Sequence, residues 1–211
     1  MSHNCVRDYV HESPWISARP PPPTPSNLSS VTSILVRVTS AELDRAHSLI
    51  RNIPDYPQPG VLFRDITPLL ADASALVATI DALIAPFRGE FDYVAGIEAR
   101  GFLLAGAAAT YANVGLIPIR KAGKLPRPAA AVSYALEYGT ATIEAHDDIP
   151  NGATVLLIDD VLATGGTLGA AHELVAHLGG SVVGTAVLFE IDELGGREAV
   201  GDPRLHAVFH S

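Results

Sequence analysis

The stretch VLLIDDVLATGGT, residues 155–167, is the part of this chain that best predicts its fold. It begins within TVLLID at 154–159, a continuous apolar run with β-branched residues, which is typical of a strand buried on both faces of a parallel sheet. Residues 167–178 follow with apolar side chains at helical spacing. The sequence therefore predicts a strand, a glycine-hinged loop and a helix in succession, the repeating unit of an α/β domain.

The loop between this strand and helix has the composition of an anion site. Glycines let backbone N–H groups approach a phosphate closely, threonine hydroxyls add donors, and the start of a helix contributes partial positive charge. The residues predicted to form this cradle are Thr164, Gly165, Gly166 and Thr167. Asp159 and Asp160 at the end of the strand would lie over a sugar, where carboxylates accept ribose hydroxyls or hold magnesium through water. The pairing suggests a sugar phosphate as ligand.

Other phosphate motifs do not fit this segment. It contains neither the GxxxxGK[ST] pattern of a P-loop nor the GxGxxG pattern of a dinucleotide fold. An ordinary strand, acidic turn and capped helix is the remaining alternative. Two adjacent acids after a buried strand carry a desolvation cost, which makes a functional site the favoured interpretation.

Helix-like and strand-like segments alternate from residue 40 onward. The pattern predicts an α/β fold with a mostly parallel central sheet flanked by helices, together with a mobile-looking loop and a hairpin. Helices are expected at 41–52, behind Ser40 as N-cap, at 72–87, capped by Asp72, and at 101–112. Strands are expected at 91–96, 114–119 and 181–189, the last closing the sheet, with a proline-rich connection at 53–60, a loop at 121–130 and a hairpin at 131–144.

Bulk composition limits the possible partners. The 211 residues carry a formal charge of −9, so general binding to nucleic acid is not expected, and any phosphate site must be local. A single cysteine and no long apolar run favour a reducing cytoplasmic setting and no membrane partner. Residues 1–38 are rich in proline and serine and are expected to be a disordered tail before one domain at 39–211. The alternative interpretation is that translation begins near Val31.

VLLIDDVLATGGT resembles the phosphoribosyl diphosphate motif of the type I phosphoribosyltransferases. Three further segments resemble the adenine branch of this family: IPDYPQPGVLFRDITPLL at 53–70, YVAGIEARGFLLAGA at 93–107, and IRKAGKLPRP with SYALEYG between 119 and 139. Together with the motif they cover residues 53–167. The resemblance implies a type I phosphoribosyltransferase domain that makes AMP and diphosphate from adenine and phosphoribosyl diphosphate with Mg2+, in purine salvage.

The same resemblance assigns roles to individual residues. Arg100, Lys121 and Lys124 would bind the diphosphate, although each cation considered alone is more often a solvated surface residue. Residues around the ribose phosphate would be Asp159, Asp160, Ala163, Thr164, Gly165, Gly166 and Thr167, with Asp159 and Asp160 holding the metal through water. A non-proline cis peptide is implied at Glu98–Ala99 or Ala99–Arg100.

Base recognition and proton transfer also follow from the resemblance. Backbone groups around Leu62 and Arg64 would read the edge of adenine and Phe63 would lie beside the ring, the alternative being that VLF is a core strand. Glu137 would handle the ring proton, and Tyr138 would cover a closed site, the alternative for Glu137 being a surface acid on a hairpin. A homodimer is implied, with Arg120 or its loop reaching toward the partner.

Two competing functions remain. One is transfer to hypoxanthine, guanine, xanthine or orotate, because the ribose phosphate cradle is common to these enzymes. The placement of VLFRD at 61–65, ahead of the diphosphate loop, favours adenine. The other is a non-catalytic regulator that senses phosphoribosyl diphosphate and binds nucleic acid. The acidic balance and the lack of a DNA-reading module count against it.

Overall fold

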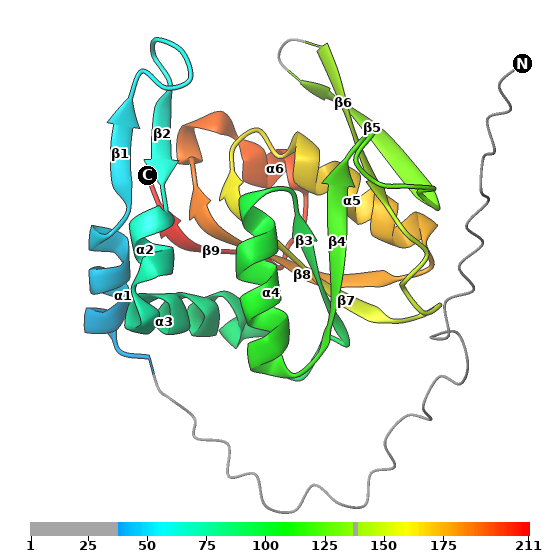
Figure 1. Cartoon of the computed structure of the whole chain (residues 1–211), viewed down its shortest axis with the longest axis horizontal. Coiled ribbons are helices and arrows are strands. Elements are labelled where there is room, and N and C mark those ends of the chain that lie inside the picture. The colour runs from blue at the N-terminus through cyan, green and yellow to red at the C-terminus, as the bar shows by residue number, and fades with distance from the viewer. Residues whose placement is uncertain (1–37, 137–138) are drawn as a thin grey trace, which may run out of the picture. The chain divides into compact units, whose positions relative to one another are not determined.

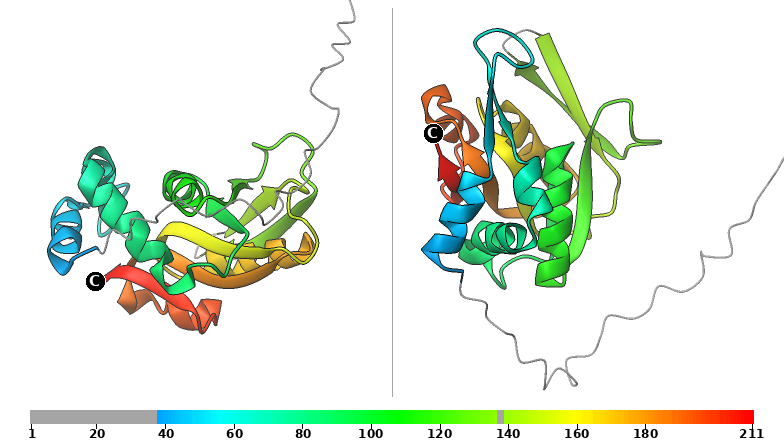
Figure 2. Two further views of the ribbon diagram at one scale, coloured as in Figure 1. Left: turned by 90° about the horizontal axis from the view of Figure 1, so that it is seen from below. Right: turned by 60° about the vertical axis from the view of Figure 1, so that its left-hand side comes forward.

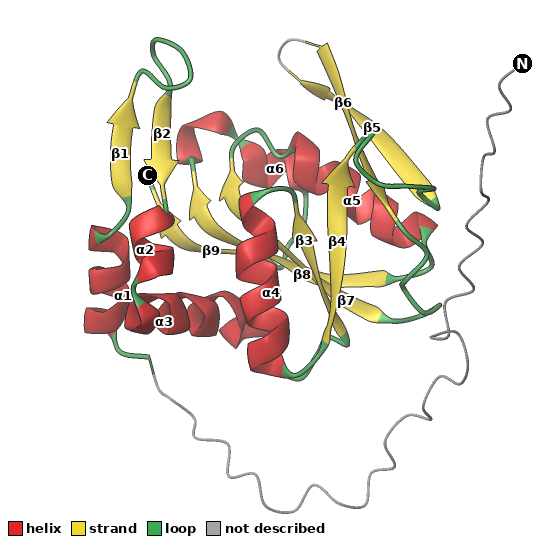
Figure 3. Ribbon diagram, in the orientation of Figure 1, coloured by secondary structure: helices red, strands yellow, loops and turns green. Residues whose placement is uncertain are grey.

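Helices and strands alternate along residues 38–136 and 139–211, the parts of the chain that the computed structural model describes (Figure 1). The helices are α1 Ser40–Ser48, α2 Thr67–Ala71, α3 Ala73–Ile84, α4 Arg100–Ala112, α5 Gly166–His177 and α6 Gly196–Val200. The strands are β1 Arg51–Pro54, β2 Leu62–Asp65, β3 Tyr93–Ile97, β4 Gly115–Lys121, β5 Ala130–Leu136, β6 Gly139–Ala145, β7 Thr154–Leu162, β8 Ser181–Glu190 and β9 Leu205–His210. Figure 3 shows their distribution.

Among the described residues, the main sheet has seven strands in the order β5-β6-β4-β3-β7-β8-β9. Strands β4, β3, β7, β8 and β9 pair in parallel, and the hairpin β5–β6 is joined antiparallel to the end of β4. Strands β1 and β2 form a separate two-stranded hairpin. The predicted fold class, an α/β domain with a mostly parallel sheet, is therefore confirmed.

Helices cover both faces of this sheet because its central strands are apolar on both sides. In β7, Val155 and Leu157 belong to the core cluster that includes α5, whereas Leu156 and Ile158 belong to the cluster that includes α1, α3 and α4. None of these four side chains is exposed, as the sequence of this strand predicted. Figure 2 shows the blue-to-green helices α1, α3 and α4 gathered on one side of the sheet.

Two predicted helices are shorter than expected. The first begins behind Thr39, not Ser40, because Thr39 and Glu42 form a capping box. It ends at Ser48, because the residues that follow, Arg51–Pro54, pair as β1 with β2. The helix predicted at 72–87 is capped by Asp72 as expected, but its α-helical part ends at Ile84. A 3-10 turn follows, because Pro86 has no N–H to continue the ladder.

Two predicted strand boundaries were also wrong. The strand expected at 154–159 continues to Leu162, so the two adjacent acids lie within it and not after it. The strand at 181–189 does not close the sheet, because β9 pairs beyond it at the edge. Among the described residues, no helix is both long enough and apolar enough to cross a membrane.

Candidate active site

Several elements meet around one cavity of about 460 Å³. The carboxyl ends of β3 and β7, the starts of α4 and α5, the end of β4 and the hairpin β5–β6 supply its walls, and ligands of open α/β sheets bind at such carboxyl ends. The sequence-predicted residues that line it are Arg100, Lys121, Asp159, Asp160 and Thr167. The fold thus brings together groups that are up to 67 positions apart in sequence, counted from Arg100 to Thr167.

The predicted phosphate cradle is a smaller cavity of about 70 Å³ beside the first. Residues 161–168, Ala163 and Thr164 among them, line it together with Asp159. Gly165 is the N-cap of α5 with a φ of +83°, and a Cβ there would lie 2.6 Å from the carbonyl oxygen of Gly196. Only glycine fits this position without strain. The loop and the start of α5 therefore have the shape and polarity of an anion site.

Asp159 and Asp160 form a buried acidic pair; both line the larger of these two cavities, and Asp159 also lines the cradle. Each is only 8% exposed, and the Asp160 N–H donates to Asp159 Oδ1 over 2.8 Å. Burial, followed by the negative charge of Asp160, raises the pKa of Asp159 well above its ordinary value. Oδ2 of Asp160 has no aligned hydrogen-bond donor within the described parts of the chain, although an arginine lies close to it. This excess of buried negative charge suits a divalent cation with its water or sugar hydroxyl ligands.

Arg100 connects the acidic pair to the β1–β2 hairpin. Its Nη2 lies 2.6 Å from Asp160 Oδ2, its Nη1 donates to the Arg64 carbonyl over 3.1 Å, and its guanidinium lies 4.7 Å from the centre of the Phe63 ring. The cis bond before it is Glu98–Ala99, one of the two predicted. Arg100 thus contacts both the region predicted to bind sugar and the region predicted to bind the base.

Two glutamates hold the basic loop after β4. The side chain of Glu98 is 8% exposed, and it accepts from Lys124 Nζ over 2.5 Å and from the Lys121 backbone N–H over 3.0 Å. The bond from Lys124 is the main reason that the pKa of Glu98 is lowered to about 2. Glu144 accepts from the backbone N–H groups of Lys124 and Leu125. Lys124 is therefore paired with Glu98 in this structure, whereas Lys121 lines the cavity.

Sequence reasoning did not give Glu98 or Glu144 these roles. The available signal for Glu98 was an acid two positions before a predicted diphosphate arginine, in EARG. Arg120, expected to reach toward a partner, has its Nε 3.4 Å from Glu98 of its own chain and donates from Nη1 to the Lys124 carbonyl. The base of the loop is therefore held by hydrogen bonds to Glu98 and Glu144.

The predicted base-reading residues lie on β2, outside the main sheet. Phe63 packs edge-on against Tyr56 at 5.2 Å and lies beneath Arg100. Leu62 is 44% exposed, and Arg64 donates from its side chain to Asn52 across the hairpin. The alternative that VLF is a core strand is wrong, because Val61 is 37% and Leu62 is 44% exposed and, within the described parts of the chain, β2 pairs with β1 alone. Binding of a base here stays a prediction.

Glu137 and Tyr138 lie outside the described residues. The strands on either side of them, β5 and β6, run along the cavity wall. One residue of SYALEYG that sequence reasoning left without a role, Tyr134, lines the cavity and accepts a hydrogen bond from Thr167 Oγ1 over 3.0 Å.

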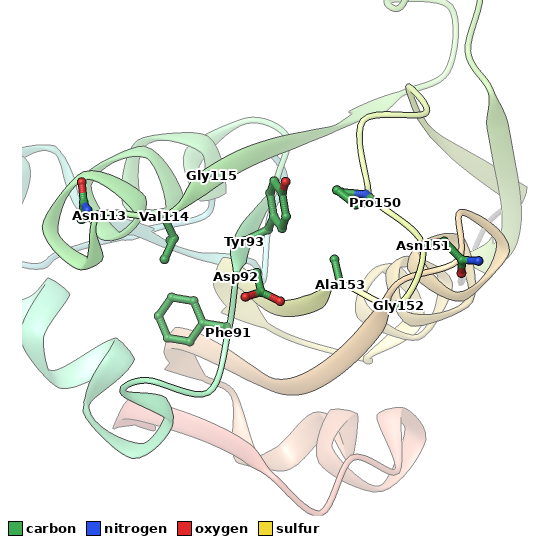
Figure 4. A pocket seen from close by; sticks show the side chains of 10 residues that line it. All are labelled: Phe91, Asp92, Tyr93, Asn113, Val114, Gly115, Pro150, Asn151, Gly152 and Ala153. Atoms are coloured by element: carbon green, nitrogen blue, oxygen red, sulfur yellow. The ribbon is translucent and has the colours of Figure 1, made fainter. Parts of the chain in front are cut away.

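A larger cavity of about 680 Å³ lies at the amino ends of β3 and β7, away from the acidic pair (Figure 4). Its lining contains no lysine or arginine, and its one carboxylate, Asp92, accepts from Thr154 N and Oγ1. A cavity without cations does not suit a diphosphate, so size alone does not identify the site here.

Comparisons with known proteins agree with this geometry. The family model described as "Phosphoribosyl transferase domain" matches residues 64–207. An adenine phosphoribosyltransferase of Arthrobacter sp. is 55% identical over 163 residues, which is 77% of this chain and 88% of that protein. The crystal structure of adenine phosphoribosyltransferase from Rhodothermus marinus has a TM-score of 0.77 and 46% identity, covering 82% of this chain and all of that one. The Giardia lamblia enzyme complexed with 9-deazaadenine has a TM-score of 0.75 and 40% identity, covering 80% of this chain and 97% of that one.

Proposed function

The chain belongs to the phosphoribosyl transferase family, and from this membership we propose that it transfers the phosphoribosyl group of phosphoribosyl diphosphate to adenine, giving AMP and diphosphate in purine salvage. The observation that carries the proposal is the buried pair Asp159 and Asp160, which lies between the anion cradle of α5 and the guanidinium of Arg100. A ribose phosphate fits this arrangement, with its phosphate at one end and its anomeric carbon toward the cations.

The reaction breaks the bond between the anomeric carbon and diphosphate as the bond to the base nitrogen forms. Positioning and electrostatic stabilisation account for most of the catalysis in such a step. The loop 163–167 holds the ribose phosphate, Arg100 and Lys121 face the diphosphate, and Lys124 reaches it by exchanging its partner Glu98 for the departing anion. Glu137 takes the proton that the base loses.

Mg2+ fits the donors present, because the pair Asp159 and Asp160 is buried and, in the described part of the chain, forms a salt bridge with one arginine, Arg100. The cation, bound through water or ribose hydroxyls, would neutralise the diphosphate as it leaves. Holding a cation is also the physical reason for retaining a carboxylate whose pKa is raised by burial, because an apolar residue would be more stable in its place.

Adenine is the proposed base because several kinds of observation agree. The similar proteins described above are named for adenine, and the Giardia structure contains 9-deazaadenine. In this chain the Phe63 ring and the backbone of Arg64 lie next to Arg100, at the side of the cavity where a base would meet the anomeric carbon.

The first expected result is formation of AMP and diphosphate from phosphoribosyl diphosphate and magnesium with adenine, and not with hypoxanthine, guanine or orotate offered in parallel. We expect at least about 100-fold preference in kcat/KM, because a site that pairs polar groups of one base leaves them unpaired with another. Turnover with a different base would leave the assigned fold unchanged and overturn the assignment of adenine as the base. Binding of phosphoribosyl diphosphate without any turnover would favour a sensor.

We further propose that the chain acts as a homodimer in the cytoplasm. The support is an apolar surface formed by α4 and β4, here called the α4–β4 face, with Leu103 56% exposed and Leu116 47% exposed. A Cβ on Gly106, one helical turn from Leu103, would contact Leu116, so the three residues are neighbours. β4 is an interior strand of the sheet, and interior strands are ordinarily covered on both faces. A second copy of the chain would cover the α4–β4 face.

Leu116→Glu is expected to shift the protein from twice the 22.1 kDa mass of one chain to a single chain, because it places a charge in the interface. Light scattering after size-exclusion chromatography checks this. Val77→Glu is the matched control, since Val77 is also exposed, at 41%, but lies on α3. A wild-type monomer, or dissociation by both variants, would contradict the assigned interface.

A further inference from the structure

The β1–β2 hairpin carries the groups proposed to read the base, yet it lies outside the main sheet (Figure 1). Within the described parts of the chain, β2 forms its ladder with β1 alone. A two-stranded hairpin by itself is only marginally stable in water. The positions of the Phe63 ring and of the Arg64 carbonyl therefore depend on side chains that join this hairpin to the rest of the domain.

The side chain of Arg64 makes one such connection. Its guanidinium carbon lies 4.4 Å from the centre of the Phe189 ring, and its Nη1 donates to Asn52 Oδ1 over 2.6 Å. Asn52 is the residue opposite Arg64 on β1, so both strands of the hairpin take part in the contact. The guanidinium thus has two separate partners, which hold it more firmly than apolar packing of its stem alone.

Phe189 is a firm support for this contact. It is buried in β8, where it pairs with Val161 of β7 on one side and with Phe209 of β9 on the other. Val161 directly follows the acidic pair in the chain. Arg64 therefore connects the hairpin to the strand beside the one that carries Asp159 and Asp160.

Arg100 makes the reciprocal contact. Its guanidinium, from the main domain, lies over the Phe63 ring of the hairpin at 4.7 Å, whereas the guanidinium of Arg64, from the hairpin, lies over a ring of the main sheet. A guanidinium over an aromatic face is attracted to it electrostatically. Because Phe63 and Arg64 are neighbours on a strand, their side chains point to opposite faces of it. The hairpin is thus held through both of its faces.

We propose that the Arg64 side chain is a positioning residue, which holds the β1–β2 hairpin on Phe189 so that the Phe63 ring and the Arg64 carbonyl face the base. This role is separate from base reading, for which only the backbone of Arg64 is invoked. The inference rests on the proposed function in taking the hairpin as the site of the base.

Arg64→Leu tests the inference, because it keeps an apolar side chain on β2 and removes the guanidinium. In the unliganded protein, we expect amide hydrogen exchange across residues 51–65 to be about five- to tenfold faster than in the wild type, with a similar rise in KM for adenine. The KM for phosphoribosyl diphosphate and kcat should stay within about threefold, because the cradle and the acidic pair lie outside the hairpin.

Arg204→Leu is the matched control. Arg204 also lies over a buried phenylalanine, Phe87 at 5.2 Å, and also donates to a neighbouring side chain, that of Glu90 over 2.6 Å. These residues are away from the cavity and from the hairpin. This variant should retain the wild-type hairpin exchange and the wild-type KM for adenine. A rise in that KM of the same size as in Arg64→Leu would overturn the positioning role, as would an unchanged KM in Arg64→Leu.

A second variant, Phe189→Leu, tests whether Arg64 acts through the Phe189 ring. In the Phe189→Leu background, Arg64→Leu should raise the KM for adenine by a smaller factor than in the wild type, because the aromatic face is already absent. Equal factors in the two backgrounds would overturn the assignment of Phe189 as the support.

Failure of this inference is distinct from failure of the proposed function, because the exchange measurement uses neither substrate. Faster hairpin exchange in Arg64→Leu, without AMP formation by the wild type, would support the anchoring of the hairpin and overturn the proposed activity. AMP formation, with equal hairpin exchange in wild type and Arg64→Leu, would do the reverse.

Discussion

Arg100→Lys is expected to lower kcat/KM for phosphoribosyl diphosphate by about 10²–10³-fold, the usual cost of removing one preorganised group that stabilises developing negative charge. The guanidinium makes three contacts at once, with Asp160, the Arg64 carbonyl and the Phe63 ring. A lysine retains the charge, but it has neither the fork of donors nor the flat surface that these contacts require. Steady-state kinetics with varied phosphoribosyl diphosphate measure the loss.

Arg88→Lys is the matched control for this experiment. Arg88 also pairs with a buried aspartate, Asp81, and also lies over an aromatic ring, that of Tyr111 at 5.7 Å, but away from the cavity. Arg88→Lys should lower the stability of the protein and leave kcat/KM within about twofold of the wild-type value. A similar loss of activity in both variants would show that Arg100 acts through the fold. Full activity of Arg100→Lys would overturn the assignment of Arg100 to the active site.

The sequence predicted the fold class and the glycine loop at the start of α5 because both depend on local patterns. The burial of Val155 to Ile158 on two faces follows from an uninterrupted apolar run, and the cradle follows from glycines at the start of a helix. Both are properties of a few neighbouring residues, so composition and spacing are sufficient to find them.

Contacts between distant segments could not be predicted in the same way. The pairing of Glu98 with Lys124 and of Thr167 with Tyr134 depends on how β3, β4, β5 and α5 meet in space. The end of α1 and the last strand β9 were misjudged for the same reason, since pairing with a distant strand determined both. Local propensity is a weak predictor where tertiary pairing competes with it.

Asp159→Asn is expected to abolish most activity, about 10²-fold or more in kcat/KM, and yet to raise the stability of the unliganded protein. Asp159 is buried next to Asp160, and the raised pKa of Asp159 means that the charged form is disfavoured in the folded state. An asparagine oxygen can still accept from the Asp160 N–H, as Oδ1 does now. The substitution therefore removes a buried charge and retains its hydrogen bond.

The direction of the pH dependence follows from the raised pKa of Asp159 in the folded state. Between the ordinary value of 3.8 and that raised pKa, the folded protein binds more protons than the unfolded chain, so wild-type stability falls as pH rises through this window. The stability advantage of Asp159→Asn should be absent below about pH 4 and largest above the raised pKa. At about pH 8 we expect Asp159→Asn to raise the free energy of unfolding by about 1–4 kcal/mol. Each kcal/mol should raise the melting temperature by about 2–4 °C.

Melting with and without magnesium distinguishes a cation-binding role of Asp159 and Asp160 from a purely structural role. With a chelator present, Asp159→Asn should melt above the wild type at about pH 8. Mg2+ together with phosphoribosyl diphosphate should then stabilise the wild type more than the variant, because only the wild type retains both carboxylates. Thermal melts across pH with each addition measure all of these differences. A variant that melts below the wild type at about pH 8 would show that the charge of Asp159 stabilises the fold, contrary to its raised pKa. If the carboxylates of Asp159 and Asp160 bind a cation, the lower stability of the protein without that cation follows from burying two acidic groups side by side.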